Sequence, residues 1–401
     1  MNCLTRTLTA LAAPVLYATS VFAAEVPATE VTDFNQTLSQ VVTEHRNNLG
    51  LVGLGAMVMQ DGKVIASAVA GERKHGSGVL LTDQDKWHIG SIGKSMTATM
   101  LARLVERGEL TWDTTIGDIY GDSAKVNEGW HHVTVEQLLT HTAGAVDNYI
   151  PTFTYLFRNP AEGPARMAAR DGMVLKFLKR EPDYPAGSRF SYANTGYLIA
   201  GAMAEKITGL PWEELVRNEV FTPLGIQSVG FGSPTGRDGR LEQPLGHKSL
   251  LGFIVSVDSD VNPLILGPAG TMHISLNDLL VYANEHLQGR SGRGKLLKAE
   301  TYQHLHTPRL ETYAYGWAIS PHEPWANEPV IFHGGSNGHW YAMLVILPES
   351  DAVMAVVSND ERGHDDEIVW PVIAQAFRLL KSPVAEASAV QMKAGTSEVV
   401  N

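Results

Sequence analysis

His88-Ile89-Gly90-Ser91-Ile92-Gly93-Lys94-Ser95 is the stretch that most directly decides the fold and the chemistry of this chain. It places Ser91 and Lys94 three residues apart, and the residues that follow, up to Gly108, show the apolar spacing of a helix. If the helix begins near Ser91, both side chains lie on one face at its N-terminal end. The unpaired backbone N–H groups there favour negative charge. The sequence therefore predicts a serine nucleophile with an amine within reach.

The same residues also have a plainer interpretation. A serine at the start of a helix is commonly an N-cap, and a lysine three residues later is commonly a solvated side chain. The S-x-x-K spacing also recurs by chance in long chains. Its significance depends on the motifs that accompany it.

The composition excludes some classes of function. The chain has 401 residues, 44% of them hydrophobic and 18% charged, which is typical of a globular protein with a large core. Its net charge is -12 and it contains no dense run of basic residues. We therefore expect no nucleic-acid partner.

The first 24 residues predict a cleaved leader. Arg6 precedes an apolar run over residues 8–22, and Val21-Phe22-Ala23 offers the small residues of a cleavage site. We expect cleavage near Ala23 or Ala24, a periplasmic or secreted mature protein, and no stable membrane span. The only cysteine, Cys3, lies in this leader, so we expect no thiol in the mature chain.

Strand patterns lie near both ends of the chain, and helical patterns lie between them. The first two strands are joined by Asp61-Gly62, a strong hairpin signal. Strands are expected at 53–60, 63–69, 313–319, 329–332, 339–347 and 352–358, and helices at 31–47, 133–139, 197–207, 212–220, 275–286 and 368–380.

These patterns predict an α/β (α+β) fold, in which an antiparallel sheet of N- and C-terminal strands is flanked by helices and a helical subdomain is inserted. We expect one domain at 25–381, with its α/β part at about 31–110 and 268–381 and its helical subdomain at about 111–267. Residues 382–401 are small and polar and are expected to form a disordered tail. A cleft at the junction is a favoured place for a site.

Two further motifs accompany the S-x-x-K helix. Tyr192 and Asn194 lie two residues apart, so in an extended segment both side chains face the same side. In His333-Gly334-Gly335-Ser336, a strand ends in glycines that let backbone approach a ligand closely. Taken singly, the first is also explained by a buried tyrosine beside a hydrogen-bonded asparagine, and the second by a flexible turn.

Together these motifs resemble the serine β-lactamase and penicillin-binding-protein superfamily, in particular the branch with class C β-lactamases, D-alanyl-D-alanine carboxypeptidases, D-aminopeptidases and related esterases. The resemblance runs from about Phe34 to Leu380 and includes the segments 138–144 and 267–270. It implies a β-lactamase/transpeptidase-like fold and a small-molecule or short-peptide substrate. It implies neither a cofactor nor a metal.

The resemblance also implies roles for single residues. Ser91 would be the nucleophile that forms an acyl-enzyme, and Lys94 would share in its activation. Tyr192 would be the general base, a phenol whose anionic form needs a nearby cation. Asn194 would hold Lys94 and contact the substrate amide. The backbone N–H groups of Ser91 and Ser336 would form the oxyanion hole.

The third motif departs from the family pattern. His333 replaces the first residue of the family's K-T-G motif, and Gly334 and Gly335 follow it on the substrate-binding strand. A histidine is mostly neutral at pH 7, so efficient lactam hydrolysis is less expected. An arginine such as Arg309 or Arg240 could instead supply a carboxylate anchor.

Two other interpretations use different residues. Gly334–Gly338 matches the G-x-S-x-G elbow of α/β-hydrolases, with Ser336 as nucleophile and Asp360 and His364 following in the right order. That elbow needs a helix after the serine, whereas the sequence favours a strand. A metal interpretation of four histidines lacks ligand spacing on a regular element: His131, His132, His304 and His306.

We therefore expect a serine hydrolase that forms an acyl-enzyme on a small amide or ester, first of all a D-amino-acid peptidase, carboxypeptidase-like or β-lactamase-related enzyme. A carboxylesterase of the same fold is the near alternative. A non-catalytic protein that binds penicillin or peptidoglycan peptide is the alternative from another class. The sequence does not specify the substrate, the deacylation rate or the oligomeric state.

Overall fold

The computed structural model describes residues 34–121, 125–146, 160–235, 240–257, 263–362 and 365–382. The predicted leader, His364 and all but the first residue of the predicted tail lie outside these ranges. The division into an α/β part and a helical subdomain stays a prediction. Within the described ranges, no helix is long and apolar enough to cross a membrane.

The main sheet has six antiparallel strands in the order β2-β1-β11-β10-β9-β8. Within it, β1 pairs antiparallel with β11 and so joins the N- and C-terminal strands, as predicted. Both residues of the β1–β2 turn, Asp61 and Gly62, have positive φ, as a two-residue hairpin turn requires. The strands are β1 (Gly53–Gln60), β2 (Lys63–Gly71), β8 (Ala318–Ser320), β9 (Val330–Ser336), β10 (Tyr341–Leu347) and β11 (Ala352–Ser358).

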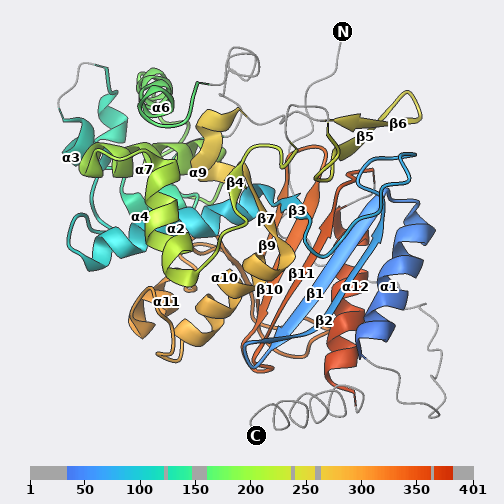
Figure 1. The fold of residues 1–401 in the computed structure, drawn as a ribbon. Helices are drawn as coiled ribbons and strands as arrows, with labels where there is room; N and C mark the ends of the chain where they lie inside the picture. The colour runs from blue at the N-terminus through green and yellow to red at the C-terminus, as the bar shows by residue number, and fades with distance from the viewer. Residues whose placement is uncertain are drawn as a thin grey trace, which may run out of the picture. The chain divides into compact units, whose positions relative to one another are not determined.

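Helices cover both faces of this sheet (Figure 1). On one face, α1 (Phe34–Leu49) and α12 (Asp365–Leu380) pack in a core that includes Leu54 and Val58 of β1. Met57 and Met59 of the same strand belong to the core on the other face, with α10 (Leu276–Gly289) and the helices described in the next paragraph. This alternation follows from the two-residue period of a strand. The predicted fold class is thereby confirmed.

The helix α2 (Gly93–Glu106) lies within this second core, and eleven of its fourteen residues are buried. Because it is buried on nearly all sides, its polar residues bond internally, as Ser95 Oγ does to the Ile92 carbonyl at 2.8 Å. It packs against α7 (Asn194–Thr208), α8 (Trp212–Val216), α9 (Gly267–Gly270) and α11 (Ala299–Leu305). Three further helices pack on α7: α3 (Ile116–Tyr120), α4 (Val135–Leu139) and α6 (Pro164–Leu178).

Several short elements differ from the expectation. The strand expected at 313–319 is reduced to β8, because Gly316 has φ +79° and its backbone lies against that of Ser95. A second sheet, β3-β7-β4, was not predicted, since strands of two to four residues carry too little alternation. These strands are β3 (Lys86–His88), β7 (Met272–Ser275) and β4 (Gly230–Phe231).

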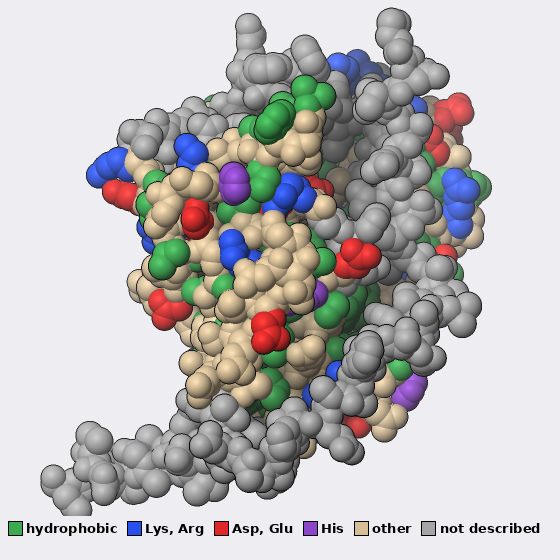
Figure 2. Space-filling view, turned by 90° about the vertical axis from the view of Figure 1, so that its right-hand side faces the viewer, with side chains coloured by type: hydrophobic (Ala, Val, Ile, Leu, Met, Phe, Trp, Pro, Cys, Tyr) green, Lys and Arg blue, Asp and Glu red, His purple; other side chains and the backbone are tan. Residues whose placement is uncertain are grey.

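A hairpin of β5 (Gly246–Leu250) and β6 (Phe253–Val257) lies in the region expected to be helical and irregular. Its turn exposes three large apolar side chains, Leu250, Leu251 and Phe253. Figure 2 shows hydrophobic side chains gathered at the upper end of one face, the end where Figure 1 shows this hairpin. Acidic and basic side chains are scattered over the rest of that face.

Two buried histidines connect α10 and α11 with the central helix. His286 contacts Thr99 Oγ1 through Nε2 at 3.0 Å and His306 through Nδ1 at 3.1 Å. Burial lowers the pKa of His286 to about 3 and holds the pKa of His306 well below its ordinary value. Both rings are therefore neutral in the folded protein at neutral pH.

We expect the free energy of unfolding to fall as the pH drops below about 6.5, because the unfolded chain then binds protons that the folded protein excludes. Each such histidine contributes a slope of about 1.4 kcal/mol per pH unit. Urea unfolding between pH 7 and pH 4 measures this slope. His286→Gln should reduce this slope by the contribution of one histidine. An unchanged slope would contradict the conclusion that His286 is neutral in the folded protein.

Candidate active site

Ser91 lies in η1 (Gly90–Ile92), a single turn of 3₁₀ helix that leads into α2. We expected the helix to begin near Ser91, and α2 itself begins at Gly93. Neither η1 nor α2 has a side-chain cap, so the N-cap interpretation of Ser91 is wrong. Its hydroxyl instead accepts a hydrogen bond from Lys94 Nζ at 3.0 Å.

Lys94 is fully buried, and its ammonium joins three separate segments. Besides Ser91, it donates to Asn194 Oδ1 at 2.6 Å and to the Ala269 carbonyl at 2.7 Å. It also lies 4.8 Å from the centre of the Tyr192 ring. A buried ammonium is stable only when its three donors find acceptors. The structure therefore brings four of the predicted residues together: Ser91, Lys94, Tyr192 and Asn194.

His141 supports the tyrosine segment and was given no role from the sequence. Its Nδ1 accepts a hydrogen bond from the Ala193 N–H at 3.1 Å, and its ring centre lies 4.3 Å from that of Tyr192. Burial, reinforced by the charge of Lys94, holds the pKa of His141 well below its ordinary value. The only sequence signal for it was its place within the segment 138–144 of the resemblance.

The glycines of β9 let this strand lie against the turn that carries Ser91. A Cβ on Gly335 would overlap the Ile89 carbonyl and lie 2.7 Å from Ser91 N. A Cβ on Gly90, whose φ is +48°, would likewise collide with the Ser336 amide nitrogen. Close approach of these backbones thus requires glycine at both positions. The N–H groups of Ser91 and Ser336 lie at this contact.

His333 is a neutral, fully engaged side chain. Its Nδ1 donates to the Gly334 carbonyl at 2.6 Å, and its Nε2 accepts from the Tyr313 hydroxyl at 2.9 Å. Burial, together with the charge of Lys94, lowers the pKa of His333 to about 3. The suggested arginines contact carboxylates of the chain itself: Arg309 pairs with Glu136 at 3.0 Å and Arg240 with Glu242 at 3.1 Å.

The α/β-hydrolase elbow is excluded by the strand order. β9 ends at Ser336, and the next element is β10, which pairs antiparallel with β9 where the elbow would need a helix. The Ser336 hydroxyl donates to Glu361 at 3.3 Å and accepts from the Gly338 N–H at 3.0 Å. The Ser336 hydroxyl therefore bonds residues near the end of β9, and Ser336 does not lie on the strand–turn–helix that the nucleophile of an α/β-hydrolase needs.

The histidines considered as metal ligands have other contacts. His304 stacks on Trp112, with ring centres 4.9 Å apart, and His306 bonds His286. His131 and His132 follow the short turn Glu128–Trp130. Among the residues that the structure describes, no group of three His, Cys, Asp or Glu side chains is placed to hold a metal.

The family model described as Beta-lactamase matches residues 38–378. The chain belongs to the Beta-lactamase family. Penicillin-binding protein 4 of Amycolatopsis lactamdurans is 28% identical over 337 residues, which cover 79% of this chain and 82% of that protein. The matched residues include both the S-x-x-K helix and the strands of the main sheet. The chain is therefore a serine hydrolase.

Solved structures share the fold of this chain. An octameric penicillin-binding protein homologue from Pyrococcus abyssi has a TM-score of 0.71 at 22% identity, over 84% of this chain and 76% of that one. A D-amino acid amidase from Ochrobactrum anthropi SV3 has a TM-score of 0.69 at 19% identity, over 87% of this chain and 99% of that one. Both have the β-lactamase and penicillin-binding-protein fold that the sequence predicted.

Gly335→Ala is expected to abolish most hydrolysis and to lower the free energy of unfolding by about 1–3 kcal/mol, because the new Cβ forces two backbones apart. Gly334→Ala is the matched control, since its Cβ would face the movable side chains of Tyr341 and Met343 at 2.9 and 3.3 Å. Turnover of p-nitrophenyl acetate and urea unfolding measure both effects. Equal activity of the two variants would show that this contact does not shape the site.

Proposed function

We propose that this serine hydrolase cleaves a small amide or ester through an acyl-enzyme on Ser91, and that its preferred substrates carry a D-amino acid. The observation that supports the nucleophile is the Lys94 ammonium, which bonds Ser91 Oγ, Asn194 Oδ1 and the Ala269 carbonyl at 3.0, 2.6 and 2.7 Å. Ser336, the rival nucleophile considered from the sequence, instead bonds Glu361 and the Gly338 N–H.

The proposed reaction has two halves. Tyr192, as phenolate beside the Lys94 ammonium, takes the proton of Ser91 Oγ, which attacks the substrate carbonyl carbon. The negative charge on the carbonyl oxygen is stabilised by the N–H groups of Ser91 and Ser336. The bond to the leaving group then breaks, and the leaving group takes the proton. In the second half, Tyr192 takes a proton from water, which attacks the ester carbonyl carbon. The bond to Ser91 Oγ then breaks and that oxygen takes the proton from Tyr192, which releases the acid and regenerates Ser91.

The choice of substrate follows from the charge at β9. A lysine at the position of His333 would offer a permanent cation to a substrate carboxylate, whereas His333 is neutral and has both ring nitrogens engaged. An uncharged amide or ester therefore suits this wall better than a free carboxylate. The fold likeness to a D-amino acid amidase is in keeping with this preference. An uncharged ester would suit the neutral His333 equally well, so a carboxylesterase is the second candidate.

Ser91→Ala should abolish turnover of D-alanine amide and p-nitrophenyl acetate, by a factor of at least about 10³. Ser336→Ala removes the rival hydroxyl but keeps the backbone N–H, so it should retain activity within about tenfold. Steady-state rates of purified, folded variants decide between them. Turnover that survives in Ser91→Ala would overturn the assignment of the nucleophile.

The charge argument predicts that D-alanyl-D-alanine amide is hydrolysed with a higher kcat/KM than D-alanyl-D-alanine at pH 7. The two peptides differ only in a terminal carboxylate, which finds no cation at His333. Release of D-alanine amide or D-alanine measures the two rates under identical conditions. A preference for the free carboxylate would mean that a cation elsewhere in the chain binds it.

We also propose that the chain is exported through a leader cleaved near Ala23 or Ala24, on the strength of Arg6 and the apolar run over residues 8–22. N-terminal sequencing of the mature protein tests this, with Ala24 or Glu25 as the expected first residue. A mature protein that begins at Met1 would refute it.

A further inference from the structure

The third acceptor of the Lys94 ammonium is a backbone carbonyl on a very short helix. Ala269 lies on α9, which has four residues and follows the 3₁₀ turn η6 (Leu264–Leu266). A helix of this length has little stability of its own. Because the carbonyl lies 2.7 Å from Lys94 Nζ, whatever holds η6 and α9 also sets the position of the ammonium.

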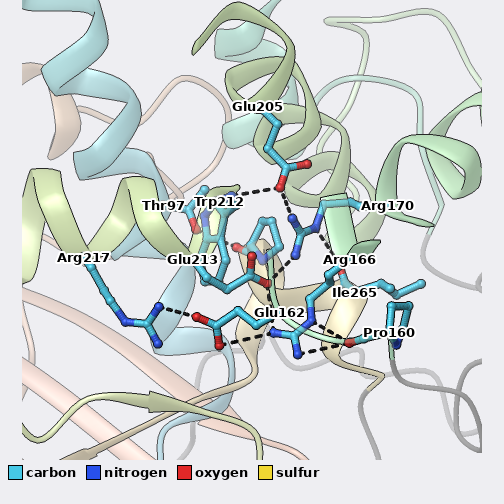
Figure 3. A network of polar contacts seen from close by, with 11 residues as sticks. Thr97, Pro160, Glu162, Arg166, Arg170, Glu205, Trp212, Glu213, Arg217 and Ile265 are labelled. Atoms are coloured by element: carbon cyan, nitrogen blue, oxygen red, sulfur yellow. Dashed lines mark hydrogen bonds and ion pairs between the residues drawn. The ribbon is translucent and has the colours of Figure 1, made fainter. Parts of the chain in front are cut away.

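Arg170 of α6 holds the start of this segment. Its side chain is fully buried, its Nε donates to the Ile265 carbonyl at 2.8 Å, and its Nη2 donates to Glu213 at 2.7 Å. Its Nη1 donates to Glu205. Figure 3 shows the guanidinium between the two carboxylates, with Ile265 beside it. A planar guanidinium with all three nitrogens engaged has a fixed orientation.

The two carboxylates are fixed in turn. Glu205 accepts the backbone N–H of Trp212 at 2.8 Å, and Glu213 accepts from Arg166 at 3.3 Å. Arg166 also lies 3.8 Å from Glu162. Breaking a buried ion pair leaves an uncompensated charge and is strongly destabilising. The network therefore defines one position for Arg170 and, through its Nε, for the Ile265 carbonyl.

Contacts on the other sides of α9 complete its placement. The Thr97 hydroxyl of α2 donates to the Pro268 carbonyl at 2.8 Å. Gly267 lies against the Trp212 ring, where a Cβ would come within 2.6 Å of it. Three carbonyls of one short segment thus have separate donors: Ile265 has Arg170, Pro268 has Thr97, and Ala269 has Lys94.

We infer that Arg170 is a positioning residue for the reaction at Ser91. It holds the Ile265 carbonyl and, through η6 and α9, fixes the Ala269 carbonyl that binds the Lys94 ammonium. Its three described hydrogen bonds go to Ile265, Glu205 and Glu213, and not to Ser91, Lys94 or Tyr192. Its effect on the reaction is therefore indirect, through η6 and the α9 that follows it. The inference rests on the proposed function, in which that ammonium activates Ser91.

Displacement of the Ala269 carbonyl would take away one of the hydrogen-bond acceptors of the Lys94 ammonium. An ammonium that loses an acceptor loses its proton more readily. The basic limb of the activity–pH profile would then move to lower pH. The titratable groups near this ammonium are the rings of Tyr192 and Tyr197, at 4.8 and 5.6 Å, and the histidines His141 and His333, whose pKa values its charge helps to lower.

Arg170→Lys is the decisive variant. It keeps a positive charge between Glu205 and Glu213 but has one nitrogen, which cannot also serve the Ile265 carbonyl. We expect kcat to fall about tenfold, KM to stay within about twofold, and the basic limb to move down by about half a pH unit. Thr97→Val removes the donor to Pro268 and should shift the limb in the same direction by less.

Arg103→Lys is the matched control. Arg103, near the other end of α2, also donates to a carboxylate, Glu219 at 3.3 Å, and to a backbone carbonyl, Leu296 at 2.5 Å. It should lower thermal stability at most and leave the shape of the pH profile unchanged. A purely structural role of Arg170 would scale the profile down without moving its limbs.

The outcomes separate the two levels of the proposal. If Ser91→Ala retains turnover, the proposed function fails and the Arg170 inference fails with it. If Ser91→Ala is inactive but a folded Arg170→Lys leaves the basic limb where it is, only the Arg170 inference is overturned. It is also overturned if Arg103→Lys moves the basic limb equally. If Arg170→Lys does not fold, as judged by circular dichroism, Thr97→Val tests the route through α9, and an unmoved basic limb in that variant overturns the inference.

Discussion

The ammonium of Lys94 is the group on which the rest of the site depends. A charge removed from water is stable only when fixed dipoles replace its hydration. Here the acceptors come from η1, from the first residue of α7 and from α9. Segments far apart in sequence therefore have to meet at one nitrogen atom. The apolar residues of α2, such as Met96, Met100 and Leu104, bury the helix in the core, and this burial leaves the ammonium to acceptors of the protein itself.

The same charge shapes its surroundings. Together with burial, it keeps His141 and His333 neutral by lowering the pKa of each. A neutral His141 can accept the Ala193 N–H and so hold the segment that carries Tyr192. A neutral His333 removes the cation with which a lysine would meet a substrate carboxylate. One buried charge thus links the geometry of the proposed catalytic groups to the proposed preference for uncharged amides and esters.

Much of this arrangement was accessible from the sequence, and the exceptions have physical causes. β1 and β11 have the predicted bounds, because alternation and hairpin signals act locally. Ser91, Lys94, Tyr192 and Asn194 were found through motif order, and the structure brings them together, while their chemical roles remain proposals. Ala269 was missed as an acceptor because a carbonyl has no side-chain signal. The role proposed for Arg170 had no sequence signal, because it rests on three long-range contacts. The strand at 313–319 was overpredicted because Gly316 has to meet Ser95.

The central claim is that the hydroxyl beside the buried ammonium forms the covalent intermediate. Peptide mapping by mass spectrometry, after brief exposure of the folded protein to a penicillin and to an activated D-alanine ester, tests it most directly. The account predicts a single acyl adduct on the peptide that contains Ser91, with none formed when that serine is alanine. An adduct on the peptide that contains Ser336, or turnover that persists when Ser91 is alanine, would contradict it.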